Sequence, residues 1–194
     1  MINVMDRLAI LCVQRKSIYS QFAQEERKSH LIDIQIYDEK RDARSFAGGM
    51  AVIAHPPCRL WGHLLHTVKI EPFDQVREKE LGIFCARAVI DNGGILEQPF
   101  DSELFKEMGL PSGGMVNKLG FTLEIAQRMF GHSMIKNTWL FFSKINYTEI
   151  EPFKPAIHNL PLKPIYHLSH KQREATPVSL AKWLIRQAIK ARLS

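Results

Sequence analysis

Short apolar segments recur along the first half of the chain and are separated by more polar ones. Residues 8–13 (LAILCV) and 50–54 (MAVIA) are continuous apolar runs, which are typical of strands buried on both faces of a sheet. Residues 30–38 alternate isoleucine with polar side chains, and residues 95–99 form a brief run that ends at a proline. We therefore predict four strands in this half of the chain.

Segments with a helical spacing of apolar residues lie between these strands. Such spacing occurs in residues 18–28 and 78–91, and again in residues 177–193 near the end of the chain. An alternation of strand and helix predicts an α/β fold, with a mostly parallel sheet and helices on its faces. We expect a Rossmann-like three-layer sandwich, formed as a single domain by residues 1–194.

The second half of the chain has a less regular pattern. Residues 100–120 are rich in glycine and proline and predict an irregular insertion, whereas residues 137–142 (NTWLFF) predict a strand. Residues 121–130 fit either a strand or a short helix. Prolines repeated through residues 149–168 predict a loop that wraps over the body of the domain.

Composition narrows the class of protein. The 194 residues are 45% hydrophobic and 24% charged, which is ordinary for a globular domain. Three widely spaced cysteines predict no disulfide framework and a reducing, cytoplasmic setting. The short apolar run near the start predicts neither a signal peptide nor a membrane span. A net charge of +6 favours a partner that carries phosphate, either a nucleic acid or a nucleotide, and the oligomeric state stays open.

The loop HPPC, which follows the predicted strand 50–54, is the strongest candidate for chemistry. Pro56 and Pro57 end the strand abruptly and place the thiol of Cys58 in a loop. Open α/β sheets bind ligands at the carboxyl ends of their strands, so this position suits a nucleophile. The alternative is a buried and inert thiol, since free cysteine is among the most buried residue types.

Other candidate residues stand at the ends of the neighbouring predicted strands. Glu97 lies at the same edge of the sheet as Cys58, and Asp38 ends the second strand, where an acid can accept a ribose hydroxyl group. Arg15 and Lys16 lie just before a predicted helix start and could bind a phosphate, although a solvated basic turn is the alternative.

A metal site and base stacking are alternatives for the same region. His55, Cys58, His63 and His66 have local spacing that could chelate zinc, but no second cysteine pair completes a zinc pattern, and we expect no metal. Trp61 fits either a stacking surface for a base or the core, and Trp139 is expected in the core.

Several of these residues also resemble motifs of a known family. A strand ending in Pro56-Pro57-Cys58, followed after one helix by a strand ending in Glu97-Gln98-Pro99, resembles the Pro-Cys and Glu-Asn motifs of cytosine-5 methyltransferases. Residues 127–132 (QRMFGH) and 136–140 (KNTWL) are similar to runs in small phage-encoded proteins of that type. The resemblance extends in order over roughly residues 52–184.

The resemblance implies a reaction and a role for each matching residue. Cys58 would add to carbon 6 of cytosine, while Glu97 would protonate or hydrogen-bond ring nitrogen 3, so that carbon 5 takes a methyl group from S-adenosylmethionine. Arg128 would steady the base or the thiol. This chemistry needs a thiol of depressed pKa, which Arg59 and His55 could supply, and a glutamic acid kept partly protonated by burial. The residues predicted to bind the substrate are Arg15, Lys16, His55, Pro57, Arg59, Trp61 and Gln98.

Two departures from the family pattern leave a second hypothesis open. The turn after residues 8–13 has no glycine, whereas the family binds the cofactor through a glycine-rich turn, and Gln98 stands where the family has asparagine. No segment is long enough to form a separate target-recognition domain. The chain could instead have lost its cofactor and hold a nucleotide, in the manner of a phage counter-defence protein, through Arg15, Lys16, Arg59 and Arg128.

Overall fold

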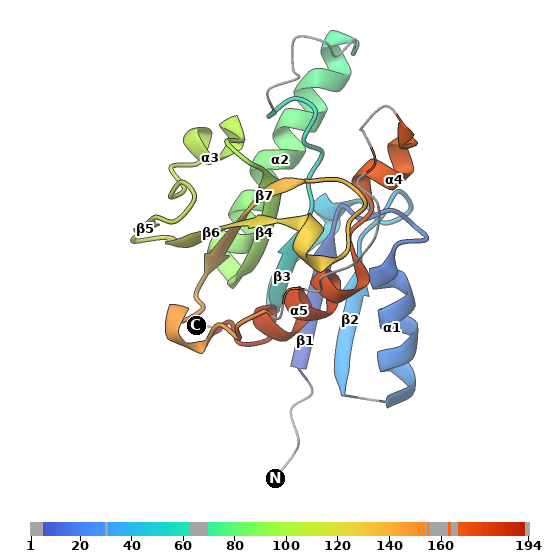
Figure 1. The fold of residues 1–194 in the computed structure, drawn as a ribbon, viewed down its shortest axis with the longest axis vertical. Helices are drawn as coiled ribbons and strands as arrows, with labels where there is room; N and C mark the ends of the chain where they lie inside the picture. Colours follow the sequence, from blue (N-terminus) through green and yellow to red (C-terminus); the bar gives the residue numbers. More distant parts are fainter. Residues whose placement is uncertain are drawn as a thin grey trace.

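A computed structural model describes residues 6–29, 31–62, 70–153, 155, 163 and 167–192. Within these residues the chain forms a seven-stranded sheet with the strand order β2-β1-β3-β4-β7-β6-β5 (Figure 1). The strands are β1 (Asp6–Leu11), β2 (Ile32–Ile36), β3 (Ala51–Ala54), β4 (Gly94–Pro99), β5 (Val116–Asn117), β6 (Gly120–Ala126) and β7 (Asn137–Ser143).

The sheet has a parallel half and an antiparallel half. Strands β2, β1, β3 and β4 run parallel, with Ile10 of β1 opposite Ile36 on one side and Ile53 on the other. Strand β7 is antiparallel to β4, and β6 is antiparallel to β7, so that β6 runs in the direction of β4. The apolar runs of β1 and β3 are buried on both faces, as a strand covered by helices requires.

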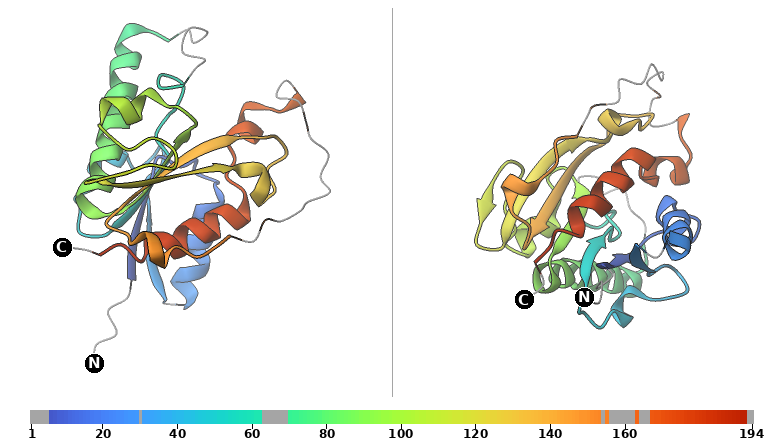
Figure 2. Two further views of the ribbon diagram at one scale, coloured as in Figure 1. Left: turned by 60° about the vertical axis from the view of Figure 1, so that its left-hand side comes forward. Right: turned by 90° about the horizontal axis from the view of Figure 1, so that it is seen from below.

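Helices cover both faces of the sheet and complete three layers (Figure 2). Helices α1 (Ile18–Ser29) and α5 (Val178–Ala188) pack on one face in a core that includes Ile53 and Leu184. Helix α2 (Pro72–Asn92) packs on the opposite face in a core with Val52 and Val89. The predicted α/β three-layer sandwich is therefore confirmed. The shorter elements are α3 (Glu103–Glu107), α4 (His170–Glu174) and the 3-10 turns η1 (Ala43–Ser45), η3 (Gln127–Phe130) and η4 (Tyr147–Glu149).

Some element boundaries differ from the sequence-based ones. Helix α2 begins at Pro72 rather than at 78; its first turns are largely exposed and carry little apolar periodicity, so the sequence pattern does not include them. Helix α5 ends at Ala188 instead of continuing to 193, since the chain turns away and the Arg192 amide donates to the Lys144 carbonyl at the end of β7. Residues 121–130 form a strand followed by a 3-10 turn, so both alternatives occur in sequence.

Two further predictions concern the irregular segments. The predicted insertion at 100–120 contains α3 and the short strand β5. Most of the predicted wrapping loop at 149–168 lies outside the described residues. None of the helices that the structure describes is long and apolar enough to cross a membrane.

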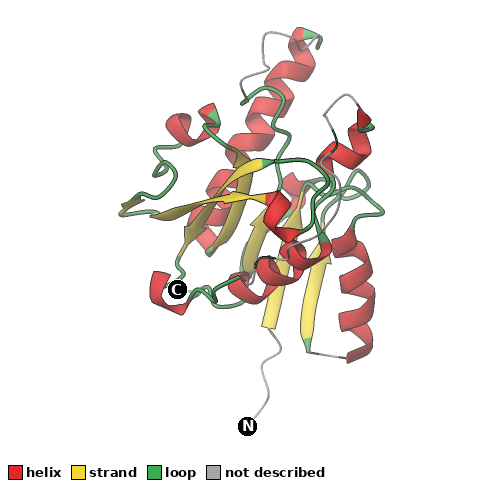
Figure 3. Cartoon of the chain, in the orientation of Figure 1, coloured by secondary structure: helices red, strands yellow, loops and turns green. Residues whose placement is uncertain are grey.

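Strand direction gathers several chain segments at one edge of the sheet. The parallel strands β1 to β4 end there, and the antiparallel arrangement of β6 and β7 brings their connection, residues 127–136, to the same edge. Figure 3 shows these loops above the strands, on the side away from the N-terminus. From the end of β1 the chain continues to β2 on one side, and from the end of β3 it continues to β4 on the other side. The two connections therefore lead away from each other, and open α/β sheets bind ligands at such a point.

Candidate functional site

A buried polar cluster centred on Glu97 lies at this edge. His55 Nδ1 is 3.1 Å from Glu97 Oε2, and Gln127 Nε2 donates to Glu97 Oε1 over 2.8 Å. The ammonium group of Lys136 is 3.7 Å from Glu97 Oε1. These partners come from the ends of β3 and β6 and from the start of β7, so the sheet topology assembles the cluster.

The cluster continues beyond Glu97 in two directions. His55 Nε2 is 3.0 Å from the hydroxyl group of Tyr19 on α1, and Gln127 Nε2 also donates to Thr138 Oγ1 over 3.0 Å. An ionised carboxylate only accepts hydrogen bonds, so we assign the proton of His55 to Nδ1, where it is donated to Glu97. The Gln127 carbonyl oxygen is buried and has no hydrogen-bond partner among the described residues, which leaves one acceptor unsatisfied beside Glu97.

The environment keeps Glu97 ionised. Burial alone opposes its charge, but Lys136, His55 and Gln127 together outweigh burial and lower the pKa of Glu97 to about 2. The expectation that burial would keep this carboxyl group partly protonated is therefore wrong. Burial, together with the negative charge of Glu97, raises the pKa of the Tyr19 hydroxyl group well above its ordinary value.

Cys58 stands in the loop after β3, within electrostatic reach of Glu97. The residue is exposed, but the protein atoms that surround its thiol raise its pKa, and the negative charge of Glu97 raises it further. Lys136 acts in the opposite direction and lowers the pKa of the thiol. The expectation of a depressed thiol pKa is therefore wrong for the unliganded protein, in which Cys58 is protonated at neutral pH.

Arg59 does not activate the thiol as the sequence suggested. Its guanidinium group binds Glu78 on α2, with Arg59 Nε donating to Glu78 Oε2 over 2.7 Å. This ion pair holds the Arg59 guanidinium group against α2. Arg128, the other predicted cation of the site, lies in η3 and donates from Nη1 to the carbonyl oxygen of His132. Its neighbour Gln127 donates to Glu97.

The proline loop is held from below by β4. Gln98 is buried and donates from Nε2 to the carbonyl oxygen of Pro56, while its own carbonyl oxygen accepts a hydrogen bond from Ser102. Both ring nitrogens of His55 are likewise occupied by protein groups. His55 and Gln98, predicted to contact the substrate, therefore position Glu97 and the Cys58 loop.

An open pocket of about 540 Å³ adjoins the Cys58 loop at the ends of β1 and β2. Asp38 lines it, as do Pro57 and Arg59 of the loop, so these three predicted residues lie around one cavity. Cys12 and Leu81 supply part of its wall. The volume falls in the range typical of small-molecule sites. Arg15 and Lys16 are exposed nearby, and the Arg15 backbone amide donates to Glu39, which also lines the pocket.

The backbone of this pocket has features that suit a ligand. Cys12, directly after β1, has φ = 60°, a left-handed conformation that is uncommon for residues other than glycine. The turn therefore adopts there a conformation usually supplied by glycine, without having one. Asp38 accepts hydrogen bonds from the amides of Lys40 and Arg41 through Oδ1, which fixes its carboxylate at the end of β2.

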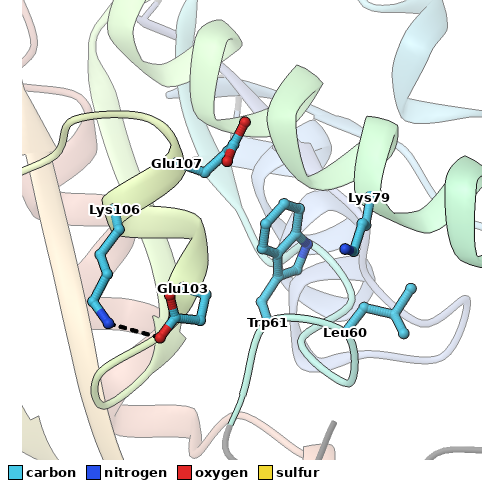
Figure 4. Close-up of a pocket in the computed structure, with 6 residues that line it drawn as sticks. All are labelled: Leu60, Trp61, Lys79, Glu103, Lys106 and Glu107. Atoms are coloured by element: carbon cyan, nitrogen blue, oxygen red, sulfur yellow. Dashed lines mark hydrogen bonds and ion pairs between the residues drawn. The ribbon is translucent and has the colours of Figure 1, made fainter.

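Trp61 lies beside a second hollow, of about 440 Å³, on the far side of the loop (Figure 4). The residue is only 6% exposed, and its ring stands between Lys79 of α2 and the side chains of α3. The Lys79 ammonium group lies 5.8 Å from the ring centroid. Trp61 therefore anchors the loop on α2 and belongs to the core, as does Trp139, which was expected there.

The contact between Trp61 and Gly82 gives a prediction about stability. A Cβ atom at position 82 would lie 2.5 Å from Trp61 Nε1, which is buried and cannot move away freely. We expect Gly82→Ala to lower the unfolding free energy by about 1–2 kcal/mol, since overpacking costs about 1–3 kcal/mol and helix propensity returns less than about 1 kcal/mol. Urea unfolding measures the change. Glu80→Ala, at an exposed position of the same helix, is the control, and a stabilised Gly82→Ala protein would contradict the contact.

The zinc alternative needs His63 and His66 among its ligands. His63 and His66 lie outside the described residues. Within the described part of the chain, no three His, Cys, Asp or Glu side chains gather so that they could hold a metal ion.

Sequence reasoning missed part of the Glu97 cluster. Tyr19 carries no signal in the sequence, because it lies in an ordinary amphipathic helix and meets His55 only through packing. Lys136 and Thr138 lie in the KNTWL run that carries part of the resemblance, but their contacts depend on the antiparallel pairing of β7 with β4.

Comparison with known proteins adds no identification to this geometry. Neither the known family models nor the curated proteins include a match to this chain.

Proposed function

We propose that this protein is a cytosine-5 methyltransferase-like enzyme that acts on cytosine in DNA or in a nucleotide. One observation carries the proposal: Glu97 is held ionised by His55, Gln127 and Lys136, within electrostatic reach of the exposed Cys58. A carboxylate and a thiol at the ends of adjacent parallel strands are the two groups that such a reaction needs on the base.

Each group has a distinct task in this proposal. The ionised Glu97 accepts a hydrogen bond from the exocyclic amino group of cytosine, a donor that carboxylates bind. This contact would offset the negative charge that raises the pKa of Cys58, so that the substrate itself would favour the thiolate. Lys136 then stabilises the thiolate. The Cys58 sulfur adds to carbon 6, and the electron pair of the C5–C6 double bond moves to carbon 5, which takes the methyl group; loss of the carbon 5 proton to water then restores the double bond and releases the Cys58 thiolate. His55 keeps its hydrogen bond to Glu97 Oε2 through Nδ1 and so orients the carboxylate towards the base.

The pocket beside the loop has residues that fit S-adenosylmethionine. Asp38 is an acid at the end of the second strand, where a ribose hydroxyl group is commonly bound. Five acids and three arginines line the pocket, so acids are in excess there, which suits a cationic ligand. Pro57 lines this pocket and precedes Cys58, which joins the two parts of the site. When bound, S-adenosylmethionine supplies an electrophilic methyl group.

A covalent trap tests this proposal. The protein is incubated with S-adenosylmethionine and single- or double-stranded oligonucleotides that contain 5-fluorocytosine, and the covalent adduct is measured by mass spectrometry. We expect an adduct that disappears in Cys58→Ala and persists in Cys85→Ala, because Cys85 lies on α2 with its side chain buried in the core. Absence of any adduct with either DNA or a free 5-fluorocytosine nucleotide, in a protein that binds S-adenosylmethionine, would refute the reaction.

A second function, a nucleotide-binding protein without methyl transfer, is favoured by the raised pKa of Cys58 and by the glycine-free turn. It predicts that calorimetry detects binding of a cytosine nucleotide but no binding of S-adenosylmethionine. It also predicts that Cys58→Ser leaves the nucleotide affinity unchanged. Together, these two results would refute the methyltransferase and support the nucleotide-binding protein.

A further inference from the structure

Two thiols from distant parts of the sequence meet beneath the pocket. Cys12 follows β1 and Cys85 belongs to α2, and their sulfur atoms lie 3.4 Å apart although 73 positions separate them. Both are free cysteines, Cys12 half-buried and Cys85 buried. Neither takes part in the chemistry proposed for Cys58 and Glu97.

The position of Cys12 is fixed by the backbone on both sides. The Leu11 carbonyl accepts from the His55 amide over 3.0 Å, and the Val13 amide donates to the Tyr37 carbonyl over 3.3 Å. Cys12 between them holds a left-handed conformation with φ = 60°. This backbone conformation is unfavourable for any residue other than glycine, so the surrounding contacts must impose it. The fold therefore brings this thiol to α2 and keeps it there.

The two thiols differ in access. Cys12 lines the open pocket, so a small molecule reaches it from solvent. Cys85 lies one helical turn after Leu81, which also lines the pocket, and is covered completely. The hydrogen bond with Cys12, followed by burial, raises the pKa of Cys85 well above its ordinary value, so Cys85 stays a thiol. Of these two thiols, Cys12 is therefore the one that an oxidant reaches first.

We propose that Cys12 and Cys85 form a site of reversible thiol oxidation, and that the oxidant is a hydroperoxide. The Cys12 sulfur attacks one peroxide oxygen, the O–O bond breaks, and Cys12 becomes a sulfenic acid while one water leaves. The Cys85 sulfur then displaces the sulfenic hydroxyl group as a second water and forms the S–S bond. Two thiols and one hydrogen peroxide thus give one disulfide and two waters.

The required movement is small and would act on the pocket. A disulfide bond is about 2.05 Å long, so the sulfur atoms approach by about 1.4 Å from their 3.4 Å separation. The bond joins the turn after β1 to α2, and both segments carry residues that line the pocket. The inference is independent of the proposed function, because it concerns the wall of the pocket and not the ligand inside it.

Treatment of the native protein with hydrogen peroxide tests the site. We expect the intact mass to fall by about 2 Da, the loss of two hydrogens in a disulfide, and to return with dithiothreitol. Tryptic mapping is expected to link the peptide of Cys12 to that of Cys85, and an alkylating reagent should label Cys58 alone in the oxidised protein.

Variants separate this pair from other thiol reactions. Cys12→Ser and Cys85→Ser should each abolish the mass loss, and Cys58→Ser should retain it, with circular dichroism to show that each variant is folded. Cys12 and Cys85 lie on different elements, so if one of the two serine variants fails to fold, the other still tests the site. Overoxidation of Cys12 without a crosslink, or a crosslink that involves Cys58, would overturn the proposal.

Discussion

Replacing Glu97 by glutamine is expected to remove a large pH-dependent part of the protein's stability. The pKa of Glu97 is lowered from an ordinary 4.5 to about 2, so the unfolded chain binds this proton more readily than the folded protein. The stabilisation is therefore complete above pH 4.5 and is lost as the pH falls towards 2. The difference between the two pKa values corresponds to about 3 kcal/mol.

Urea unfolding between pH 7 and acid, on the wild type and Glu97→Gln, measures this effect. The wild type should lose about 3 kcal/mol more than the variant over that interval. Glu124→Gln is the matched control, because Glu124 is an exposed glutamate on β6 of the same sheet and should leave the wild-type profile unchanged. Parallel profiles for the wild type and Glu97→Gln would show that Lys136 and His55 do not hold the charge.

The same substitution is expected to suppress the proposed reaction. Glu97→Gln removes the charged acceptor for the cytosine amino group, although it also removes the negative charge that raises the pKa of Cys58. Because a positioned catalytic group typically contributes a factor of about 10²–10⁴ to a rate, formation of the 5-fluorocytosine adduct should slow by up to that factor. The loss should occur at pH 7, where unfolding experiments can verify that the variant is folded. A normal adduct rate combined with the altered pH profile would leave Glu97 a structural role only.

Gly94→Ala is expected to destabilise the sheet strongly. Gly94 has φ = +126°, and a Cβ atom there would lie 1.9 Å from the carbonyl oxygen of Val52, its partner on β3. Neither backbone can move without separating β3 from β4, which carry Cys58 and Glu97 at their ends. We expect a loss of more than about 4 kcal/mol, enough to prevent folding of a marginally stable domain.

The control for Gly94→Ala is another glycine with a positive φ. Gly49 has φ = +81°, and a Cβ atom added there would meet no other atom within 4 Å, so Gly49→Ala should cost only the backbone penalty of about 1–2 kcal/mol. Circular dichroism and urea unfolding of both variants separate the steric clash from the strain of the dihedral angle. Similar stability for the two variants would contradict the close approach of β3 and β4.

The sequence was a good guide to the elements that carry strong apolar patterns. Residues 8–13 and 50–54 form strands β1 and β3 within two residues at each end, because runs of buried apolar residues have few other uses. Residues 121–130 were ambiguous, since β6 and the following 3-10 turn share one pattern. The first turns of α2 could not be predicted, because the polar residues 77–80 separate Phe73 and Val76 from the apolar face that begins at Leu81.

The positions of Cys58 and Glu97 followed from strand direction, but their ionisation did not. Parallel strands end at one edge, so two residues at strand ends could be placed together from the sequence. The charges around them depend on partners chosen in three dimensions. Arg59 pairs with Glu78 on a helix, and Lys136 reaches Glu97 from an antiparallel strand. No local pattern specifies either choice.

Strand β7 lies between β4 and β6 in the sheet and is antiparallel to both, which has a consequence for how the protein folds. The Glu97 cluster draws on α1, β3, β4, η3 and β7, so the site exists only after segments more than 100 residues apart, such as those of Tyr19 and Lys136, have come together. Contacts between such distant segments form late and slow the folding reaction, because the entropy of closing long loops opposes them. A nascent chain that ends after β4 already contains Cys58 and Glu97 but lacks Gln127 and Lys136. During synthesis, the Cys58 thiol is therefore made before two of the partners of Glu97.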